Sequence, residues 1–314
     1  KKAREEARAK GNGQEQELRR GDQIQAARWS LDDRDPNATR ERLAALPQGA
    51  ARRTLALRIR LKATRQARQT REALDTARLL GKHRAFSAGA AQSIVRGLAI
   101  ELIQSAHDPA QLVQIWASLE NSERNMPELA VQAAQRLAHL GGDPAQVRAW
   151  LLPVWERMVE LPDGLPEGLA LKLIHCLEDG LSTIDAGWLA RIEAAQQANP
   201  RDARLQYLAG MACLKRQLWG KAQQLLTQAA EQLTDKSLRA SAWRNLAELA
   251  EQRGDSEAAA HAWKSAAQQQ RWVRGAATAL TPLLPAFLSQ PRYGQGLPYR
   301  HGPLCPHPLV DPWC

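Results

Sequence analysis

The sequence predicts an all-α protein, built as a right-handed solenoid of stacked helical hairpins. The first observation is internal repetition: the segment from Ala203 to Leu233 superposes on the segment from Ser241 to Ala267 with a shift of 37 residues, which carries Gly210 onto Ala247. In both segments, large apolar residues alternate with alanines at helical spacing. The composition agrees, because 44% of the residues are hydrophobic, 10 are Trp, and no long alternating run of β-branched residues occurs.

Residues 1–50 are expected to form a polar, partly helical N-terminal segment. Gly11-Asn12-Gly13 and Asp35-Pro36-Asn37 interrupt it, and a short amphipathic helix is expected around Thr39 to Leu46. The chain starts with Lys1 and not with Met, so we interpret it as a processed product or a fragment of a longer protein. It has no run of 18 apolar residues, so no transmembrane helix is expected within it.

Residues 51–273 are expected to form the solenoid, with about six hairpin units. Four weaker copies begin near Thr54, Gln92, Pro127 and Gly168. Pro200 stands where the last of these four would end its second helix. A hairpin cannot bury its apolar face alone, so the stacking of units is expected to supply the core.

The two clear units each consist of a helix, a tight turn and a second helix. The turns are expected at Gln217-Leu218 and at Gly254-Asp255. Where helices cross, small residues allow close approach and large residues fill the space beside them. Seven residues are expected at these crossings: Gly210, Ala222, Trp243, Leu246, Ala259, Trp263 and Ala266. With this pattern the unit resembles the tetratricopeptide repeat.

The positive charge of the chain is concentrated in one predicted hairpin. The net charge is +10, and the stretch from Ala51 to Arg84 contains eleven Lys or Arg against two acidic residues. Within it, Arg58, Lys62, Arg65 and Arg68 are spaced to form a stripe on one helical face. Three interpretations stay open: a solvated face, a seat for acidic lipid headgroups, or a seat for an anionic protein partner. Nucleic acid is disfavoured, because no aromatic residue is interleaved to stack on bases.

The sequence predicts no enzyme and no metal site. His175 and Cys176 stand beside Glu178 and Asp179, but neighbouring residues on a helix point in different directions. We therefore expect a structural role for them, and buried packing roles for Cys176 and Cys213. Phosphate-binding glycine loops and Cys/His clusters with metal-ligand spacing are absent from the sequence. Disulfides are unnecessary in a chain of this length, which agrees with a reducing compartment.

Two longer segments carry a family resemblance. They are ALDTARLLGKHRAFSAGAAQSIVRGLA, from Ala73 to Ala99, and the run from Leu169 to Leu233 that includes ANPRDARLQYLAGMACLKRQLWGKAQ. Together with the unit from Ser241 to Ala267, they resemble the HemY family of bacterial proteins associated with haem and porphyrin biosynthesis. The resemblance covers roughly residues 54–270. An unrelated flavoprotein oxidase has the same name, but its dinucleotide fingerprint does not occur in this sequence.

The resemblance implies a protein of the bacterial inner membrane, with two N-terminal transmembrane helices and a repeat domain facing the cytoplasm. It carries over no catalytic residue. We therefore expect a non-catalytic, membrane-tethered scaffold that binds proteins, including enzymes of tetrapyrrole synthesis, and needs no cofactor. The alternative is a carrier that binds haem or porphyrin itself. The basic stripe is the expected contact surface for an acidic partner or for lipid headgroups.

The last segment, residues 274–314, is proline-rich and is expected to be a disordered or extended tail. Eight of the 17 prolines fall between Pro282 and Pro312, where they prevent helical hydrogen bonding. The motif HGPLCPHP places Cys305 between His301 and His307, and a thiolate and an imidazole can ligate haem iron. The alternative is that a proline-rich tail contains a Cys-Pro dipeptide by chance.

Overall fold

The computed structural model describes residues 19, 21–51, 53–161 and 164–279, and this part of the chain is all-α. Residues 21–32 are helical. The first half continues with α2 (Pro36–Ala44), α3 (Gln48–Ala51), α4 (Thr54–Gln66), α5 (Thr70–Lys82), α6 (Ala88–Gln104), α7 (Pro109–Ser118), α8 (Asn121–Arg124) and α9 (Pro127–His139). The second half has α10 (Pro144–Glu160), α11 (Glu167–Asp179), the 3-10 helix η1 (Leu181–Thr183), α12 (Ala186–Ala198), α13 (Ala203–Lys215), α14 (Trp219–Gln232), α15 (Lys236–Gln252) and α16 (Ser256–Ala279). The all-α prediction is therefore confirmed for the described residues.

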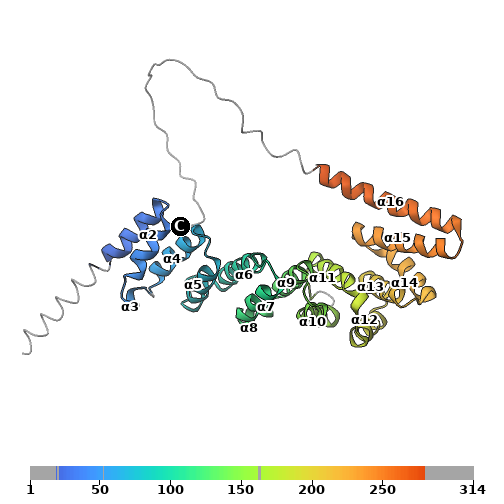
Figure 1. Cartoon of the computed structure of the whole chain (residues 1–314), viewed down its shortest axis with the longest axis horizontal. Helices are drawn as coiled ribbons and strands as arrows, with labels where there is room; N and C mark the ends of the chain where they lie inside the picture. Colours follow the sequence, from blue (N-terminus) through green and yellow to red (C-terminus); the bar gives the residue numbers. More distant parts are fainter. Residues whose placement is uncertain (1–18, 20, 52, 162–163, 280–314) are drawn as a thin grey trace, which may run out of the picture.

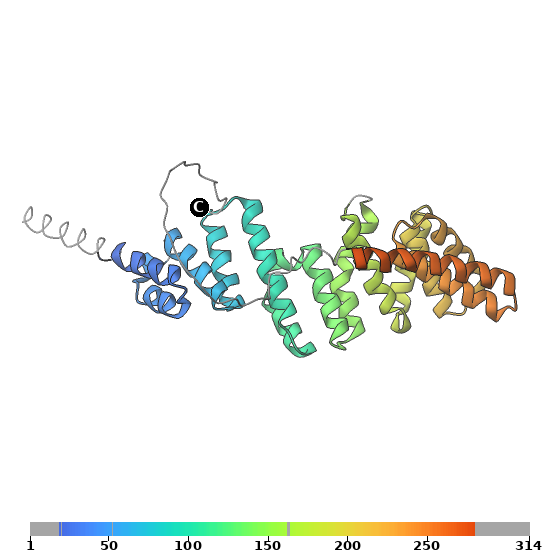
Figure 2. The ribbon, with the colours of Figure 1, turned by 90° about the horizontal axis from the view of Figure 1, so that it is seen from above.

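The helices form one elongated row, in which neighbours along the chain are neighbours in space. Figure 1 shows α2, α3 and α4 at one end and α15 and α16 at the other, with α9 to α11 between them. The view from above in Figure 2 shows the blue to orange helices in order along the long axis, with the red end of α16 running back over the yellow-green helices. The closest packing is between consecutive helices, such as α4 with α5, α13 with α14 and α15 with α16. Contacts between residues far apart in sequence are therefore few, and the fold is built from local pairs.

A common type of turn reverses the chain between several of these helices. One residue takes a left-handed conformation, and the next backbone N–H reaches back to the helix it has left. Gln217 has φ +60°, and the N–H of Leu218 donates to the Cys213 carbonyl at 2.9 Å. Gly254 has φ +77°, and the N–H of Asp255 donates to the Ala250 carbonyl at 3.0 Å. Both predicted turns are thus confirmed, and left-handed residues stand at Arg34, Arg68, Arg84 and Gly141 in the corresponding places.

Aspartate side chains start many of the helices. An aspartate at the N-cap accepts a hydrogen bond from a backbone N–H of the first turn, which has no partner within the helix. The aspartates that accept such bonds are Asp35, Asp108, Asp143, Asp185, Asp202, Asp235 and Asp255. The interruption suggested at Asp35-Pro36-Asn37 is present, because the helix of residues 21–32 ends before it, and the same residues start α2: Asp35 caps the helix and Pro36 fits its first turn.

A continuous apolar core runs along the row from Leu57 to Ala262, and a second cluster joins residues 21–32 to α2 and α4. At the predicted crossings, the small residues are buried: Gly210, Ala222, Ala259 and Ala266. Leu246 is buried at 8% exposure, and Trp243 packs half-buried against the core. Trp263 departs from the expectation. Its side chain is 38% exposed, and its indole N–H donates to Glu251 at 2.7 Å.

Tryptophan pairs connect α7, α10 and α12. Trp116 and Trp150 stack with ring centroids 4.8 Å apart, and Trp155 meets Trp188 edge to face at 5.9 Å. All four side chains are buried, so each pair contributes large apolar area as well as ring contact. The ring contacts therefore join helices that are not consecutive in the chain: α7 with α10, and α10 with α12.

The last helix extends beyond residue 273, where we expected the solenoid to end and the tail to begin. Helix α16 continues to Ala279, past position 273. Residues 280–314, which are the rest of the predicted tail, lie outside the described residues. Within the part of the chain that the structure describes, no helix is both long enough and apolar enough to span a bilayer.

Candidate functional site

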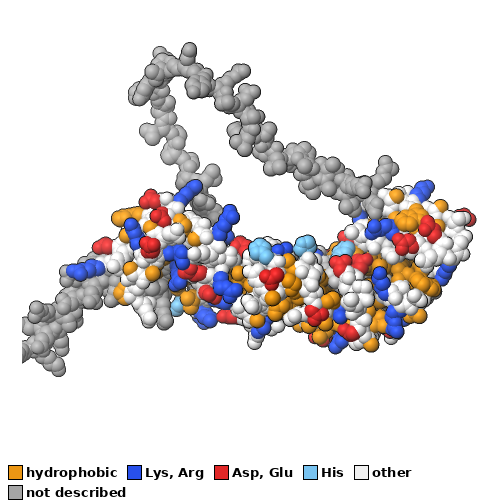
Figure 3. All heavy atoms as spheres, viewed as in Figure 1, with side chains coloured by type: hydrophobic (Ala, Val, Ile, Leu, Met, Phe, Trp, Pro, Cys, Tyr) orange, Lys and Arg blue, Asp and Glu red, His pale blue; other side chains and the backbone are white. Residues whose placement is uncertain are grey.

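The basic hairpin consists of α4 and α5, and its two faces differ sharply. Helix α4 turns Leu57 and Leu61 into the core, while Arg58, Lys62 and Arg65 are exposed on the opposite side. The predicted spacing of the three basic residues therefore does place them on the solvent side of one helix. Figure 3 shows Lys and Arg side chains, in blue, over this end of the described chain.

Several basic residues of the hairpin are used in ion pairs. Arg60 donates to Glu72 at 2.7 Å, and Arg40 reaches the same carboxylate at 3.1 Å. Arg78 pairs with Asp75 at 2.8 Å and with Glu123 at 2.6 Å. The acidic side chains near the hairpin therefore form ion pairs with arginines that are not part of the exposed stripe.

The four residues of the predicted stripe have different surroundings. Arg58 donates from Nη2 to the Ala85 carbonyl at 2.7 Å, and its guanidinium lies over the Phe86 ring at 5.4 Å from the centroid. Arg68 lies in the turn after α4, with φ +55°, and so outside the helix that carries the others. Lys62 and Arg65 have no ion pair or side-chain hydrogen bond within the described residues. On α4 itself, they are the two positive charges of the stripe that remain available to a partner, and Arg68 in the following turn is exposed as well.

A buried ion pair that the sequence did not indicate ties α5 to the connection between α7 and α9. Arg78 binds Glu123 with two parallel hydrogen bonds, at 2.8 Å and 2.6 Å, and the Glu123 side chain is only 3% exposed. The same carboxylate accepts the backbone N–H of Glu120 at 2.9 Å and so caps α8. The Glu123 hydrogen bonds raise the pKa of Arg78 above its ordinary value, although burial acts against this. The partners are far apart in sequence, and no local pattern reveals them.

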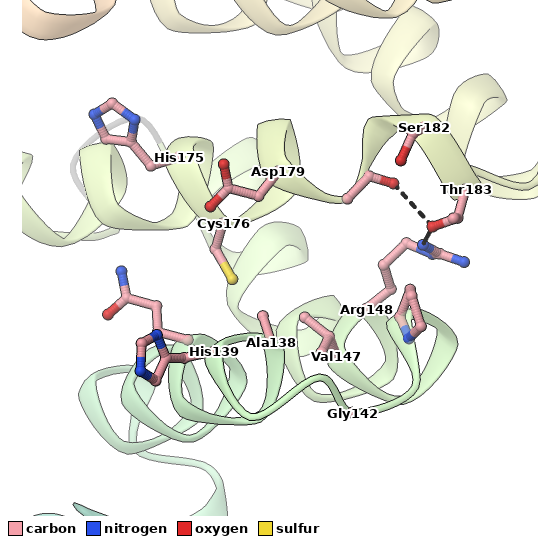
Figure 4. Close-up of a pocket in the computed structure, with 13 residues that line it drawn as sticks. Ala138, His139, Gly142, Val147, Arg148, His175, Cys176, Asp179, Ser182 and Thr183 are labelled. Atoms are coloured by element: carbon pink, nitrogen blue, oxygen red, sulfur yellow. Dashed lines mark hydrogen bonds between the residues drawn. The ribbon is translucent and has the colours of Figure 1, made fainter. Parts of the chain in front are cut away.

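A pocket of about 480 Å³ opens between α9, α10, α11 and η1. Figure 4 shows His175, Cys176 and Asp179 of α11 on one side, and Ala138, His139 and Val147 facing them across the hollow. Arg148 stands at one end beside Thr183, to which its Nη1 donates at 3.2 Å. His175, Cys176 and Asp179 all line this pocket, although Figure 4 shows their side chains pointing in different directions, as expected; Glu178 does not line it.

The α11 residues of the pocket are not arranged for nucleophilic catalysis. Burial, assisted by the charge of Asp179, raises the pKa of the Cys176 thiol to about 12, so it stays protonated and weakly nucleophilic. Burial, assisted by Glu178, raises the pKa of the Asp179 carboxyl. The hydrogen bond with Glu178 raises the pKa of His175. Within the described residues, the Cys176 thiol has no hydrogen bond to His175 or Asp179.

Glu178 instead belongs to a buried polar network between α11, α13 and α15. The Tyr207 hydroxyl donates to Glu178 and also bonds the Ser241 hydroxyl at 2.8 Å. Tyr207 is fully buried, and burial together with the Glu178 charge raises its pKa. The network explains why three polar groups are stable at the meeting of three helices. A tyrosine within the apolar run of residues 203–215 was the only sequence signal for it.

The structure describes the two cysteines of the helices but not the predicted haem motif. Cys176 and Cys213 are buried free thiols, as expected. Among the described residues, no group of three or more His, Cys, Asp or Glu side chains is placed to hold a metal ion. His301, Cys305 and His307 lie outside the described residues.

The chain matches no protein-family model, and the search of curated proteins gives no match either. The resemblance to the HemY family therefore depends on the sequence segments quoted above.

Proposed function

We propose that the protein is a non-catalytic scaffold that binds other proteins, and that its partners include enzymes of haem and porphyrin biosynthesis. The observation that carries the first part is the exposed, unpaired pair Lys62 and Arg65 on a rigid helix at one end of an elongated helical row. The second part comes from the HemY resemblance. We propose no catalytic role for any residue.

The finer description of the fold that we propose is a right-handed solenoid of tetratricopeptide-like hairpins. Three features support it: consecutive helices pair most closely, the same left-handed turn recurs, and a glycine stands where α13 crosses α14. Such an array presents one helix of each unit along a continuous surface, which can bind a peptide or a protein face without any catalytic group.

We propose an acidic protein surface as the partner of Lys62 and Arg65. Exposed and unpaired cations attract anionic surfaces at long range, and the attraction is screened by salt. The neighbouring Arg60 is equally basic, but it is neutralised by Glu72 and serves the fold. The two kinds of arginine on one helix therefore offer a comparison between partner binding and structure.

The location we propose is the cytoplasmic face of a bacterial inner membrane, with the repeat domain tethered by segments that would precede Lys1. Basic residues close to a membrane anchor favour the cytoplasmic side. Fractionation of the full-length gene product tests this: recovery in the membrane fraction supports it, and recovery in the soluble fraction contradicts it.

The function is tested by affinity capture of the tagged, full-length protein, followed by mass spectrometry of what is bound. The test variant is Lys62→Ala/Arg65→Ala. The control is Lys215→Ala/Arg216→Ala, which removes the same charge from exposed residues at the end of α13. We expect porphyrin-pathway enzymes with the wild type and the control, and their loss with the test variant.

Two outcomes would contradict this proposal in different ways. Equal recovery from all three proteins would show that the basic face is not the binding surface. Absence of pathway enzymes, together with stoichiometric pigment on the purified protein, would favour the haem or porphyrin carrier. In that case, the visible spectrum of a Cys305→Ala variant would show whether the tail motif ligates the iron.

A further inference from the structure

The pocket between α9, α10, α11 and η1 contains a buried cation whose hydrogen-bonding capacity is largely unused. Arg148 is only 7% exposed. A guanidinium has five N–H donors, but within the described residues Arg148 makes a single hydrogen bond, from Nη1 to Thr183 at 3.2 Å. Its buried Nε has no acceptor. The nearest carboxylate oxygen, from Asp185, is 3.7 Å from Nε, which is beyond hydrogen-bond distance.

A buried guanidinium of this kind is stable only where its charge and its N–H groups are satisfied. Asp185 neutralises part of the charge, but it is 56% exposed and already accepts the backbone N–H of Trp188. Arg148 thus stands at one end of an accessible hollow with a donor group that lacks an acceptor. Nη2 of the same guanidinium also has no hydrogen bond within the described residues and is not among the buried atoms, so an anion entering the hollow would supply an acceptor to it.

We propose that this pocket binds a small monocarboxylate with an apolar body, whose carboxylate lies on the guanidinium of Arg148. The planar guanidinium fork matches the two oxygens of a carboxylate. The rest of the ligand should be apolar, because Ala138, Pro144 and Val147 line the same hollow. This site is separate from the basic face of α4, and the proposal does not depend on the proposed function.

The charge of the lining selects a monoanion over a phosphate. Arg148 is the only Lys or Arg among the residues that line the pocket, and Asp179 contributes a carboxyl group to the same wall. A dianionic phosphate would face one permanent cation and an acidic neighbour, whereas a monocarboxylate requires only the one cation. The volume of about 480 Å³ suits a small organic molecule.

The test uses 4-fluorobenzoate as the probe and the full 314-residue chain, with binding followed by ¹⁹F NMR. The matched probe is 4-fluorobenzamide, which has a similar shape but no charge. We expect the acid to bind with a dissociation constant of about 1 mM or below and the amide to bind at least about tenfold more weakly, the ratio that one charge-assisted interaction gives. Inorganic phosphate at equal ionic strength should not displace the acid.

Two variants locate the site. Arg148→Gln removes the charge, and Ala138→Phe fills the hollow from an exposed position of α9 without altering the core. The control, Arg216→Gln, removes an exposed arginine that does not line the pocket. We expect both test variants to lose at least about tenfold in affinity and the control to bind as the wild type does.

The proposal is overturned by any of three results: no binding of the acid up to about 20 mM, equal binding of acid and amide, or unchanged binding in a folded test variant. Circular dichroism shows whether each variant is folded. If Arg148→Gln does not fold, Ala138→Phe decides the question alone, because it leaves the buried arginine in place.

Discussion

Gly210 is the position where the packing argument can be tested most directly. It lies in α13, where this helix crosses α14. A Cβ atom added there would lie 2.9 Å from Leu226 Cγ, 3.0 Å from Leu226 Cδ2 and 3.3 Å from Leu225 Cβ. Carbon atoms in contact are normally about 3.5–4.0 Å apart. Since Leu226 is fully buried and Cγ is near its backbone, the methyl group can be accommodated only if the two helices move apart.

Gly210→Ala should therefore destabilise the protein although alanine is the better helix former. Overpacking in a well-packed core costs about 1–3 kcal/mol, and the higher helix propensity of alanine returns about 1 kcal/mol. We expect a net loss of up to about 2 kcal/mol in the free energy of unfolding. The measurement is urea unfolding followed by circular dichroism and tryptophan fluorescence.

Gly97 provides the matched control, because it also lies inside a helix. It is exposed in α6, and a Cβ added there would meet nothing within 4 Å. Gly97→Ala should thus stabilise the protein by about 1 kcal/mol through propensity alone. In a Leu226→Ala background, Gly210→Ala should cost less than in the wild type, because the two closest contacts are gone and the nearest that remains is Leu225 Cβ at 3.3 Å. If Gly210→Ala and Gly97→Ala had the same effect, the close crossing of α13 and α14 would be refuted.

Three further predictions concern an ion pair, a turn and a pH dependence. Arg78→Ala leaves the Glu123 carboxylate buried and unpaired, so it should cost about 3–5 kcal/mol in urea unfolding, and Arg78→Ala/Glu123→Gln should recover part of this. Gln217→Gly should stabilise the protein by about 0.5–1 kcal/mol. A left-handed residue other than glycine costs roughly 1–2 kcal/mol, and the greater entropy of glycine in the unfolded chain offsets part of this gain. An unchanged midpoint of urea unfolding would contradict this prediction. Burial works against ionisation of Asp202, but the hydrogen bonds and charge of Arg204 outweigh burial and lower the pKa of Asp202. The ionised carboxylate therefore stabilises the fold above the ordinary carboxyl pKa, and this contribution is lost as pH falls through the lowered pKa. The stability lost by Asp202→Asn should accordingly be large near neutral pH and vanish in acid, and a loss independent of pH would exclude this origin.

The sequence predicts those parts of the fold that depend on local signals. The turns at Gln217 and Gly254 follow from helical periodicity and its interruption within a few residues, and the structure has both. The burial of Ala222 and Ala259 follows from the same periodicity. A fold made of consecutive pairs has few long-range contacts, and this is why local patterns predict so much of it.

The candidate sites depend on contacts that periodicity does not contain. Arg148 of α10 contacts Thr183 of η1, with α11 between them in the chain, and Arg78 of α5 contacts Glu123 of α8, with α6 and α7 between them. Nothing near either arginine in sequence distinguishes it from an exposed one, because both occur on helices with many charged residues. Arg58 is exposed, as its spacing indicates, but its guanidinium also donates to the Ala85 carbonyl, which the spacing does not indicate. The spacing of a charged residue thus predicts its side of the helix, and only the structure shows what it contacts.

The exposed Trp263 has a physical explanation in the pairing of small and large residues at the two clear crossings. In the first unit, Gly210 leaves room for Leu226, which is fully buried. In the second, Ala247 occupies the position of Gly210, and the larger Trp263 occupies that of Leu226. Less space is available for a bigger side chain, so the indole is 38% exposed and satisfies its N–H with Glu251 at 2.7 Å. The two aligned segments therefore place side chains of different volume at corresponding positions. The alignment treats Leu226 and Trp263 as equivalent, so it does not distinguish a buried leucine from a tryptophan at the surface.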